Sequence, residues 1–179
     1  MQVIPFIQND PLLQDNNVCP VLVLGLGNLL MQDEGIGVRV VQQLQRDYDF
    51  PPQVELLDGG TAGMALYEHI VDRLHVIVID AVNTGREPGS LVKLENEEVP
   101  AFFRNKVSPH QMALSDILAA LKISGEQLPE IIVVGIEPVN LKTGLEMSDI
   151  VLGKLNALVE KTIECLSGLG LTVQVKSQH

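Results

Sequence analysis

Three residues able to bind a metal ion lie after predicted strands or at the start of predicted helices: Glu34, Asp80 and His110. Asp80 directly follows the apolar run 76–79, whereas Glu34 and His110 each lie at a predicted helix start. Because the carboxyl ends of neighbouring parallel strands share one edge of a sheet, we expect the three side chains to converge there. Two carboxylates and one imidazole would leave open positions on a borderline divalent ion such as Ni²⁺ or Zn²⁺. The pattern therefore indicates a candidate metal site.

Each of these residues also has a structural explanation. A carboxylate at position 34 is favoured by the dipole of the following helix, so helix capping and metal ligation explain Glu34 equally well. Asp80 ends a four-residue apolar strand, where an ionised side chain is costly unless it is paired or bound, and a functional role is favoured. His110 taken alone is more typical of a capping or surface histidine. His69 and His75 lack such partners in the sequence and are expected to be structural or exposed.

The elements that would position these residues alternate between strand and helix. The apolar run 21–24 predicts a strand buried on both faces, and Gly25 and Gly27 allow a sharp turn before a helix over about 34–48. A second strand over 54–57 ends at Asp58 and leads through a second glycine loop into the apolar segment 64–71. A third strand covers 75–79.

The rest of the chain continues the alternation. Residues 90–94 predict a strand at a sheet edge, which could run antiparallel. A helix with apolar positions from 112 to 121 and a strand over 131–135 follow. A long helix over about 148–166 and a terminal strand over 171–175 complete the chain. This order predicts a three-layer α/β/α fold: a mostly parallel, twisted sheet of about five strands with helices on both faces. Residues 19–179 are expected to form one domain, preceded by a loose or locally packed extension over 1–18.

Composition narrows the functional classes. The chain has 179 residues, of which 46% are hydrophobic, and a formal net charge of −11. That charge argues against nucleic acid as a partner, because binding to phosphates requires clustered Lys and Arg. No apolar run reaches the length of a membrane span, so no membrane partner is expected. The two cysteines, Cys19 and Cys165, lie far apart in a chain with no signal-peptide pattern, which predicts structural thiols in a reduced, cytoplasmic protein.

The glycine turn of residues 25–27 also invites comparison with a dinucleotide site. A third glycine at position 30 would complete the fingerprint, but Leu30 stands there. A pyrophosphate needs free backbone donors and no nearby anions, whereas Asp33 and Glu34 lie where the phosphates would bind. No nucleotide cofactor is therefore expected.

Four motifs in order resemble the hydrogenase maturation endopeptidases, in particular the branch that serves uptake-type nickel-iron hydrogenases. They are Gly25–Asn28 with Asp33–Gly37, Asp58–Gly63, Asp80–Ala81, and Ser108–Gln111, and the resemblance covers about residues 20–168. It implies an endopeptidase that removes the C-terminal extension of a hydrogenase large-subunit precursor after nickel insertion. It also implies that Glu34, Asp80 and His110 contact the metal. Nickel would be supplied by the precursor and serve as the recognition signal, and zinc or cadmium could occupy the site in vitro.

The chemistry of cleavage is less constrained. The sequence offers no Ser-His-Asp arrangement, no HExxH helix and no plausible Cys-His pair. We predict that Asp58, at the end of the second strand, is an additional carboxylate that activates water or recognises the substrate. Backbone donors of Gly59, Gly60 and Thr61 could bind the cleaved strand. Two other functions stay open: a non-catalytic nickel-sensing chaperone of the precursor, and an independent metallohydrolase that holds its own metal.

Overall fold

A computed structural model describes residues 19–95, 98–99 and 109–177. Its central sheet has five strands in the order β3-β1-β4-β6-β5. The strands are β1 (Val21–Leu26), β3 (Val54–Gly60), β4 (His75–Ala81), β6 (Glu130–Ile136) and β5 (Leu91–Glu95). The first four run parallel, and β5 pairs antiparallel with β6 at the edge. The predicted α/β architecture and the edge strand are confirmed. The predicted extension over 1–18 lies outside the described residues.

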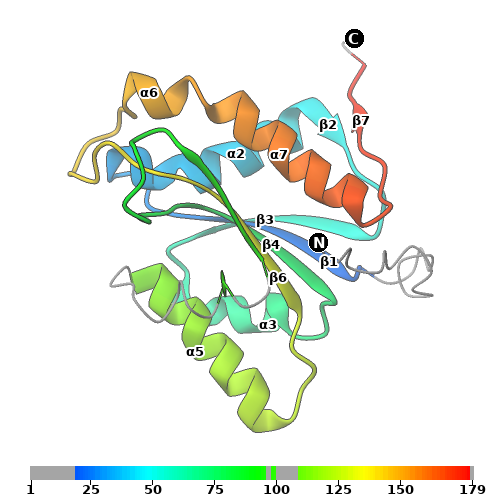
Figure 1. Ribbon diagram of the computed structural model, residues 1–179. Coiled ribbons are helices and arrows are strands. Elements are labelled where there is room, and N and C mark those ends of the chain that lie inside the picture. The colour runs from blue at the N-terminus through cyan, green and yellow to red at the C-terminus, as the bar shows by residue number, and fades with distance from the viewer. Residues whose placement is uncertain (1–18, 96–97, 100–108, 178–179) are drawn as a thin grey trace.

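Helices cover both faces of the sheet (Figure 1). One layer contains α2 (Ile36–Asp47), α6 (Asp149–Leu152) and α7 (Leu155–Gly168), and the opposite layer contains α3 (Tyr67–Ile70) and α5 (Pro109–Ser124). Two 3₁₀ turns, η1 (Gln32–Gly35) and η2 (Gly63–Leu66), lead into α2 and α3. Within the described part of the chain, no helix combines the length and apolarity needed to cross a membrane.

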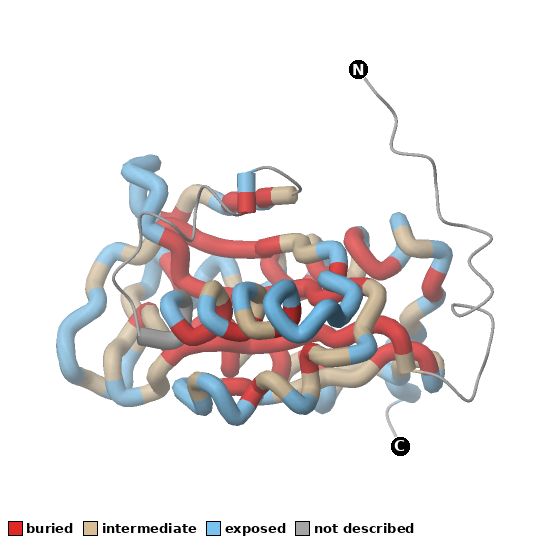
Figure 2. The backbone as a smooth tube through the Cα atoms, turned by 90° about the horizontal axis from the view of Figure 1, so that it is seen from below, coloured by how far each residue is buried: buried red, intermediate tan, exposed pale blue. Residues whose placement is uncertain are grey.

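The alternation of side chains along each strand divides the core into two clusters. In β1, Val21 and Val23 pack with α2 and α7, whereas Leu22, Leu24 and Leu26 pack with α5 and η2. All six residues of β1 are buried. Figure 2 shows the consequence: the central strands are buried along most of their length, and the helices alternate buried and exposed residues. The continuous apolar runs of the sequence therefore correspond to strands covered on both sides.

Two predicted elements differ from the structure. The helix expected over 148–166 is divided into α6 and α7 at Gly153 and Lys154, where glycine raises the entropic cost of a helical backbone. The terminal strand expected over 171–175 is only β7 (Gln174–Val175), which pairs antiparallel with β2 (Tyr48–Asp49) in a separate two-stranded sheet. The chain end thus packs beside the C-terminus of α2 rather than extending the main sheet.

Candidate active site

Close backbone packing places the start of α2 on the carboxyl ends of β1 and β4. A Cβ atom added at Gly37 would overlap the carbonyl oxygens of Leu26 and Ile79, and one added at Gly27 would overlap the carbonyl of Glu34. Gly27 also has a φ of 127°, a conformation that L side chains rarely adopt. Glycines are therefore required here by both space and conformation. They bring the backbone of Glu34 to the edge of the sheet where the sequence predicted it.

Asp80 lies on β4, beside β1 in the sheet, and faces the layer that contains α5. It is 2% exposed and pairs in register with Gly135 of β6. Side chains alternate along a strand, so Asp80 shares a face with Val76 and Val78, which pack in the same cluster as the buried residues of α5. The predicted strand-end position of Asp80 is confirmed, with its carboxylate directed to one particular face.

His110 lies in the first turn of α5, and this end of the helix lies at the same edge of the sheet. Ala113, three residues further on, has its Cβ 4.0 Å from the position that a Cβ on Gly63 would occupy. Gly63 begins η2, three positions after Gly60, the last residue of β3. The backbone of His110 is thus placed at the strand ends, on the face of the sheet to which Asp80 points. Its side chain lies outside what the structure describes.

Convergence of the three predicted metal ligands stays a prediction. The elements that carry Glu34, Asp80 and His110 meet at one edge of the sheet. Among the residues whose side chains are described, a set that excludes His110, no three His, Cys, Asp or Glu side chains form a group able to hold a metal ion.

Asp58, the nominated catalytic carboxylate, is exposed and lies on the opposite face from Asp80. It shares its face with Val54 and Leu56, which pack with α2, and its Oδ2 accepts a hydrogen bond from Gln42 Nε2 at 3.4 Å. The adjacent loop is held by its own backbone: the N–H of Gly27 donates to the carbonyl of Gly60 at 3.0 Å. The structure thus separates Asp58 from Asp80 by the plane of the sheet. The predicted roles of Asp58, Gly59, Gly60 and Thr61 stay predictions.

Asp33 has a structural role that the sequence analysis did not assign. Its side chain is fully buried and accepts hydrogen bonds from the backbone N–H groups of Val139 and Asn140 at 2.9 Å each. It also accepts from the backbone N–H of Ser148 at 2.7 Å and from the Ser148 hydroxyl at 3.0 Å. These bonds attach the loop 138–148 to η1. Asp33 therefore ties η1, which carries Glu34, to the loop that follows β6.

Glu137 is a second buried carboxylate at the same edge of the sheet, and sequence reasoning missed it. It is 4% exposed and accepts hydrogen bonds from the backbone N–H of Thr84 at 2.8 Å, the Thr84 hydroxyl at 2.8 Å and the N–H of Gly85 at 3.2 Å. Burial raises the pKa of Glu137, but hydrogen bonds from Thr84, Gly85 and Arg86 lower it by more, so the pKa lies below its ordinary value. The signal that singled out Asp80, an acid directly after a buried strand, is also present at Glu137.

His69 and His75, expected to be structural or exposed, are half-exposed and buried respectively, and each lies beside an acidic side chain. His69 Nδ1 lies 3.5 Å from Glu55 Oε1, and His75 Nδ1 lies 3.4 Å from Glu130 Oε2. Both cysteines are free, and burial raises the pKa of the Cys165 thiol. A high pKa keeps this thiol protonated and unreactive, as expected for a structural cysteine.

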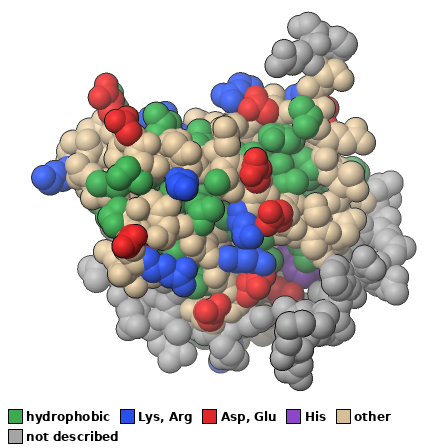
Figure 3. Space-filling model, turned by 45° about the horizontal axis from the view of Figure 1, so that its top comes forward, with side chains coloured by type: hydrophobic (Ala, Val, Ile, Leu, Met, Phe, Trp, Pro, Cys, Tyr) green, Lys and Arg blue, Asp and Glu red, His purple; other side chains and the backbone are tan. Residues whose placement is uncertain are grey.

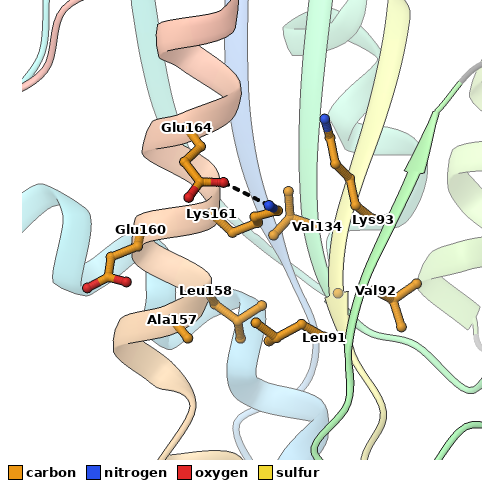
Figure 4. A pocket seen from close by; sticks show the side chains of 10 residues that line it. Leu91, Val92, Lys93, Val134, Ala157, Leu158, Glu160, Lys161 and Glu164 are labelled. Atoms are coloured by element: carbon orange, nitrogen blue, oxygen red, sulfur yellow. Dashed lines mark hydrogen bonds and ion pairs between the residues drawn. The ribbon is translucent and has the colours of Figure 1, made fainter. Parts of the chain in front are cut away.

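A hollow of about 380 Å³ lies between α7 and the edge strand β5 (Figure 4). Its floor is apolar, and the charged side chains around it include an ion pair between Lys161 and Glu164 at 2.7 Å. Lys93, on the opposite side, pairs with Glu95 at 2.7 Å. The hollow opens on the α7 face of the sheet, whereas Asp80 points to the α5 face. It is therefore a separate feature from the candidate site.

Comparison with known proteins identifies the family. The family model described as hydrogenase maturation protease matches residues 38–165, more than half of the chain. Hydrogenase 2 maturation protease of Escherichia coli K12 is 41% identical over 84% of this chain and 93% of that protein. The chain belongs to the hydrogenase maturation protease family. The predicted enzyme class, a peptide hydrolase, is confirmed with it.

Other relatives and solved structures agree with the assignment. The hydrogenase expression/formation protein HoxM of Azotobacter vinelandii is 37% identical over 87% of this chain and 76% of that protein. The hydrogenase maturating endopeptidase HybD from E. coli superposes with a TM-score of 0.83 at 40% identity, covering 87% of this chain and 97% of that one. The [NiFe] hydrogenase maturation protease HybD from Thermococcus kodakarensis reaches a TM-score of 0.67 at 28% identity, covering 81% and 97%. The fold of this family is therefore the fold of this chain.

Proposed function

We propose that this protein removes the C-terminal extension of a nickel-iron hydrogenase large-subunit precursor and uses nickel already bound in that precursor as its recognition signal. The proposal rests on one observation. In a member of the hydrogenase maturation protease family, the backbones of Glu34, Asp80 and His110 lie at one edge of the sheet. In this proposal nickel arrives as part of the substrate and is not a resident cofactor.

The donor set fits such an ion. Carboxylate and imidazole groups suit nickel and zinc, and three protein ligands leave coordination positions for groups of the precursor. Asp80 is almost fully buried, so attraction between its carboxylate and a cation bound at the sheet edge would be screened little by solvent. A divalent ion bound there would polarise a carbonyl group or a water molecule. Zinc or cadmium could occupy the same ligands in vitro.

Residues of the chain itself would carry out the remaining tasks. Asp58 is exposed at the end of β3, where its carboxylate could take a proton from the attacking water or contact the substrate. Backbone groups of Gly59, Gly60 and Thr61 would bind the extended segment that is cut. Asp58 lies on the other face of the sheet from Asp80, so the scissile segment would have to cross the ends of the strands to reach both.

The first test uses the precursor with and without nickel. Wild-type protein should shorten a nickel-loaded, C-terminally extended precursor and leave the nickel-free precursor intact, as read by mass spectrometry. The variants Asp80→Asn and His110→Ala should stay folded in thermal melts and lose processing by about a hundredfold or more, since each removes a ligand. Asp116→Asn and His69→Ala, at half-exposed or exposed positions elsewhere, are the matched controls and should process normally.

Each other result selects a different function. Specific cleavage of the nickel-free precursor would exclude nickel sensing while leaving the protease assignment intact. Binding of the loaded precursor without cleavage would identify a nickel-sensing chaperone. Cleavage of generic peptides by protein that retains its own metal would identify an independent metallohydrolase. Near wild-type processing by both folded variants would show that Asp80 and His110 are structural.

We propose further that the reaction occurs in the cytoplasm, with the hydrogenase precursor as the partner. Both cysteines are free, which is compatible with a reducing compartment. The net charge of −11 favours a protein or cationic partner over nucleic acid. No nucleotide cofactor enters the proposal.

A further inference from the structure

Apolar side chains are exposed where the loop 138–148 crosses the segment that leads into η1. Leu30 is 59% exposed, Leu145 66%, Val139 45% and Leu141 39%. Two backbone hydrogen bonds join the segments: the N–H of Gly144 donates to the carbonyl of Leu30, and the N–H of Gln32 donates to the carbonyl of Gly144, each at 2.9 Å. We call the four residues Leu30, Val139, Leu141 and Leu145 the apolar loop surface.

This surface is held in place rather than carried on a free loop tip. The buried Asp33 carboxylate accepts hydrogen bonds from Val139 and Asn140 at one end of the loop and from Ser148 at the other. Between them, the Arg39 guanidinium donates to the carbonyl of Leu145 at 3.1 Å. Exposing leucines on a fixed loop has no benefit for folding, and contiguous exposed apolar groups usually mark an interaction site.

The apolar loop surface is attached to η1, the turn that carries Glu34. Asp33, which anchors the loop, directly precedes Glu34, and both belong to η1. Beside the surface, three apolar residues, Leu145, Met147 and Leu152, line an open hollow of about 330 Å³ together with the charged Arg39, Glu146 and Asp149. A protein whose chain end reached Glu34 and Asp80 would lie against these residues.

The charge of the surface specifies the chemistry of its partner. Residues 28–32 have no charged side chain, and residues 138–148 have one positive and one negative, Lys142 and Glu146. The whole chain has a net charge of −11, so this part is nearly neutral in a strongly acidic protein. On the α2–α7 side, Figure 3 likewise shows Lys and Arg side chains interspersed with Asp and Glu. An apolar, uncharged partner surface is complementary to it.

We propose that the apolar loop surface docks an apolar patch on the folded body of the hydrogenase precursor, next to the base of its C-terminal extension. The inference rests on the proposed function and adds a second contact to it. A flexible extension alone would offer few contacts, so affinity for the folded substrate would come mainly from this surface. The candidate ligands would then act on a chain end that docking has already positioned.

The test replaces three of the exposed leucines: Leu30→Ser, Leu141→Ser and Leu145→Ser in one protein. The matched control replaces three exposed apolar residues elsewhere: Ile123→Ser, Leu128→Ser and Val175→Ser, which are 87%, 44% and 73% exposed. With nickel-loaded precursor, the docking variant should show KM raised by about tenfold or more and kcat within about twofold of wild type. The control should keep both values within about twofold.

Binding of the precursor is also measured by calorimetry, because this readout does not need turnover. If wild-type protein binds the precursor but does not cleave it, the proposed function is contradicted, and the affinities still test the docking proposal. Equal affinity of wild type and the docking variant would overturn the docking proposal. A fall in kcat with unchanged affinity would assign the leucines to the chemistry instead and overturn it as well. A wild-type dimer in sedimentation experiments that the three substitutions dissociate would also overturn the proposal. The surface would then bind a second copy of this chain.

Discussion

At the residue scale, two carboxylates are buried where apolar strands of the central sheet end. Asp80 and Glu137 both follow apolar strands, and both are almost fully buried. Glu137 is stabilised by N–H and hydroxyl groups of the loop 84–86, so its charge organises backbone. Asp80 lies on the face that α5 covers, toward the helix that begins with His110. The two acids therefore face different elements, and the role of Asp80 as a metal ligand stays a prediction.

The lowered pKa of Glu137 leads to a pH-dependent stability prediction. A carboxyl group whose pKa is lowered by folding stabilises the protein above its ordinary value of 4.5, and this contribution is lost as the pH falls through the lower folded pKa. Glu137→Gln should therefore lower the free energy of unfolding at pH 7 by about 1–3 kcal/mol. The difference from wild type should shrink between about pH 5 and pH 3, as measured by urea unfolding across that range.

The exposed Glu87, on the same loop, supplies the control. Glu87→Gln should change stability by less than about 0.5 kcal/mol at every pH. A constant difference between Glu137→Gln and wild type down to acid pH would show that the charge of Glu137 does not stabilise the fold.

At the element scale, the loop 138–148 depends on contacts between distant segments. Asp33 of η1 accepts hydrogen bonds from residues 106 to 115 positions away along the chain. The Ser148 hydroxyl donates to Asp33 and also accepts from the backbone N–H of Val151 at 3.3 Å, as the N-cap of α6. One carboxylate thus stabilises the start of α6, the loop and η1 together.

This coupling can be measured. Ser148→Ala should destabilise the protein by about 1 kcal/mol, the usual effect of losing an N-cap. Asp33→Ala should cost about 3 kcal/mol or more, because it leaves several buried N–H groups without their acceptor. The double variant should cost less than the sum, since both substitutions remove the same Ser148–Asp33 bond.

Thermal and urea unfolding of wild type, the two single variants and the double variant gives the double-mutant cycle. Ser124→Ala, which removes a hydroxyl that donates to a backbone carbonyl at the end of α5, is the control and should add independently to Asp33→Ala. Strict additivity of Ser148→Ala with Asp33→Ala would show that the two side chains are not coupled.

At the scale of the whole molecule, the site is expected to be completed by the substrate. Three candidate ligands at an open sheet edge would leave other coordination positions of a metal ion without protein ligands. The protein alone should therefore bind nickel weakly. Purified protein should retain well under one equivalent of metal, as measured by elemental analysis. Its Tm should be the same with and without a chelator, since weak binding stabilises little at low free metal. A full equivalent that survives chelation, with a Tm that falls when it is removed, would indicate a resident metal instead.

Much of the fold and part of the site follow from local sequence signals. The apolar runs 21–24 and 76–79 specify buried strands, and Gly27 and Gly37 mark the places where η1 and α2 pack on the ends of the sheet. Asp80 was found because an acid ending an apolar strand is costly without a partner. These signals are readable because strand alternation and glycine conformations depend on a few neighbouring residues.

The tertiary structure alone decided which face each side chain occupies and which distant groups it meets. Asp58 and Asp80 lie near the carboxyl ends of two parallel strands that flank β1, yet Asp58 faces α2 and Asp80 faces the layer with α5. The partners of Asp33 lie more than a hundred residues away, and β7 pairs with β2 rather than with the main sheet. Such contacts depend on how whole elements pack. A local pattern of residues does not specify which distant residues this packing brings next to it.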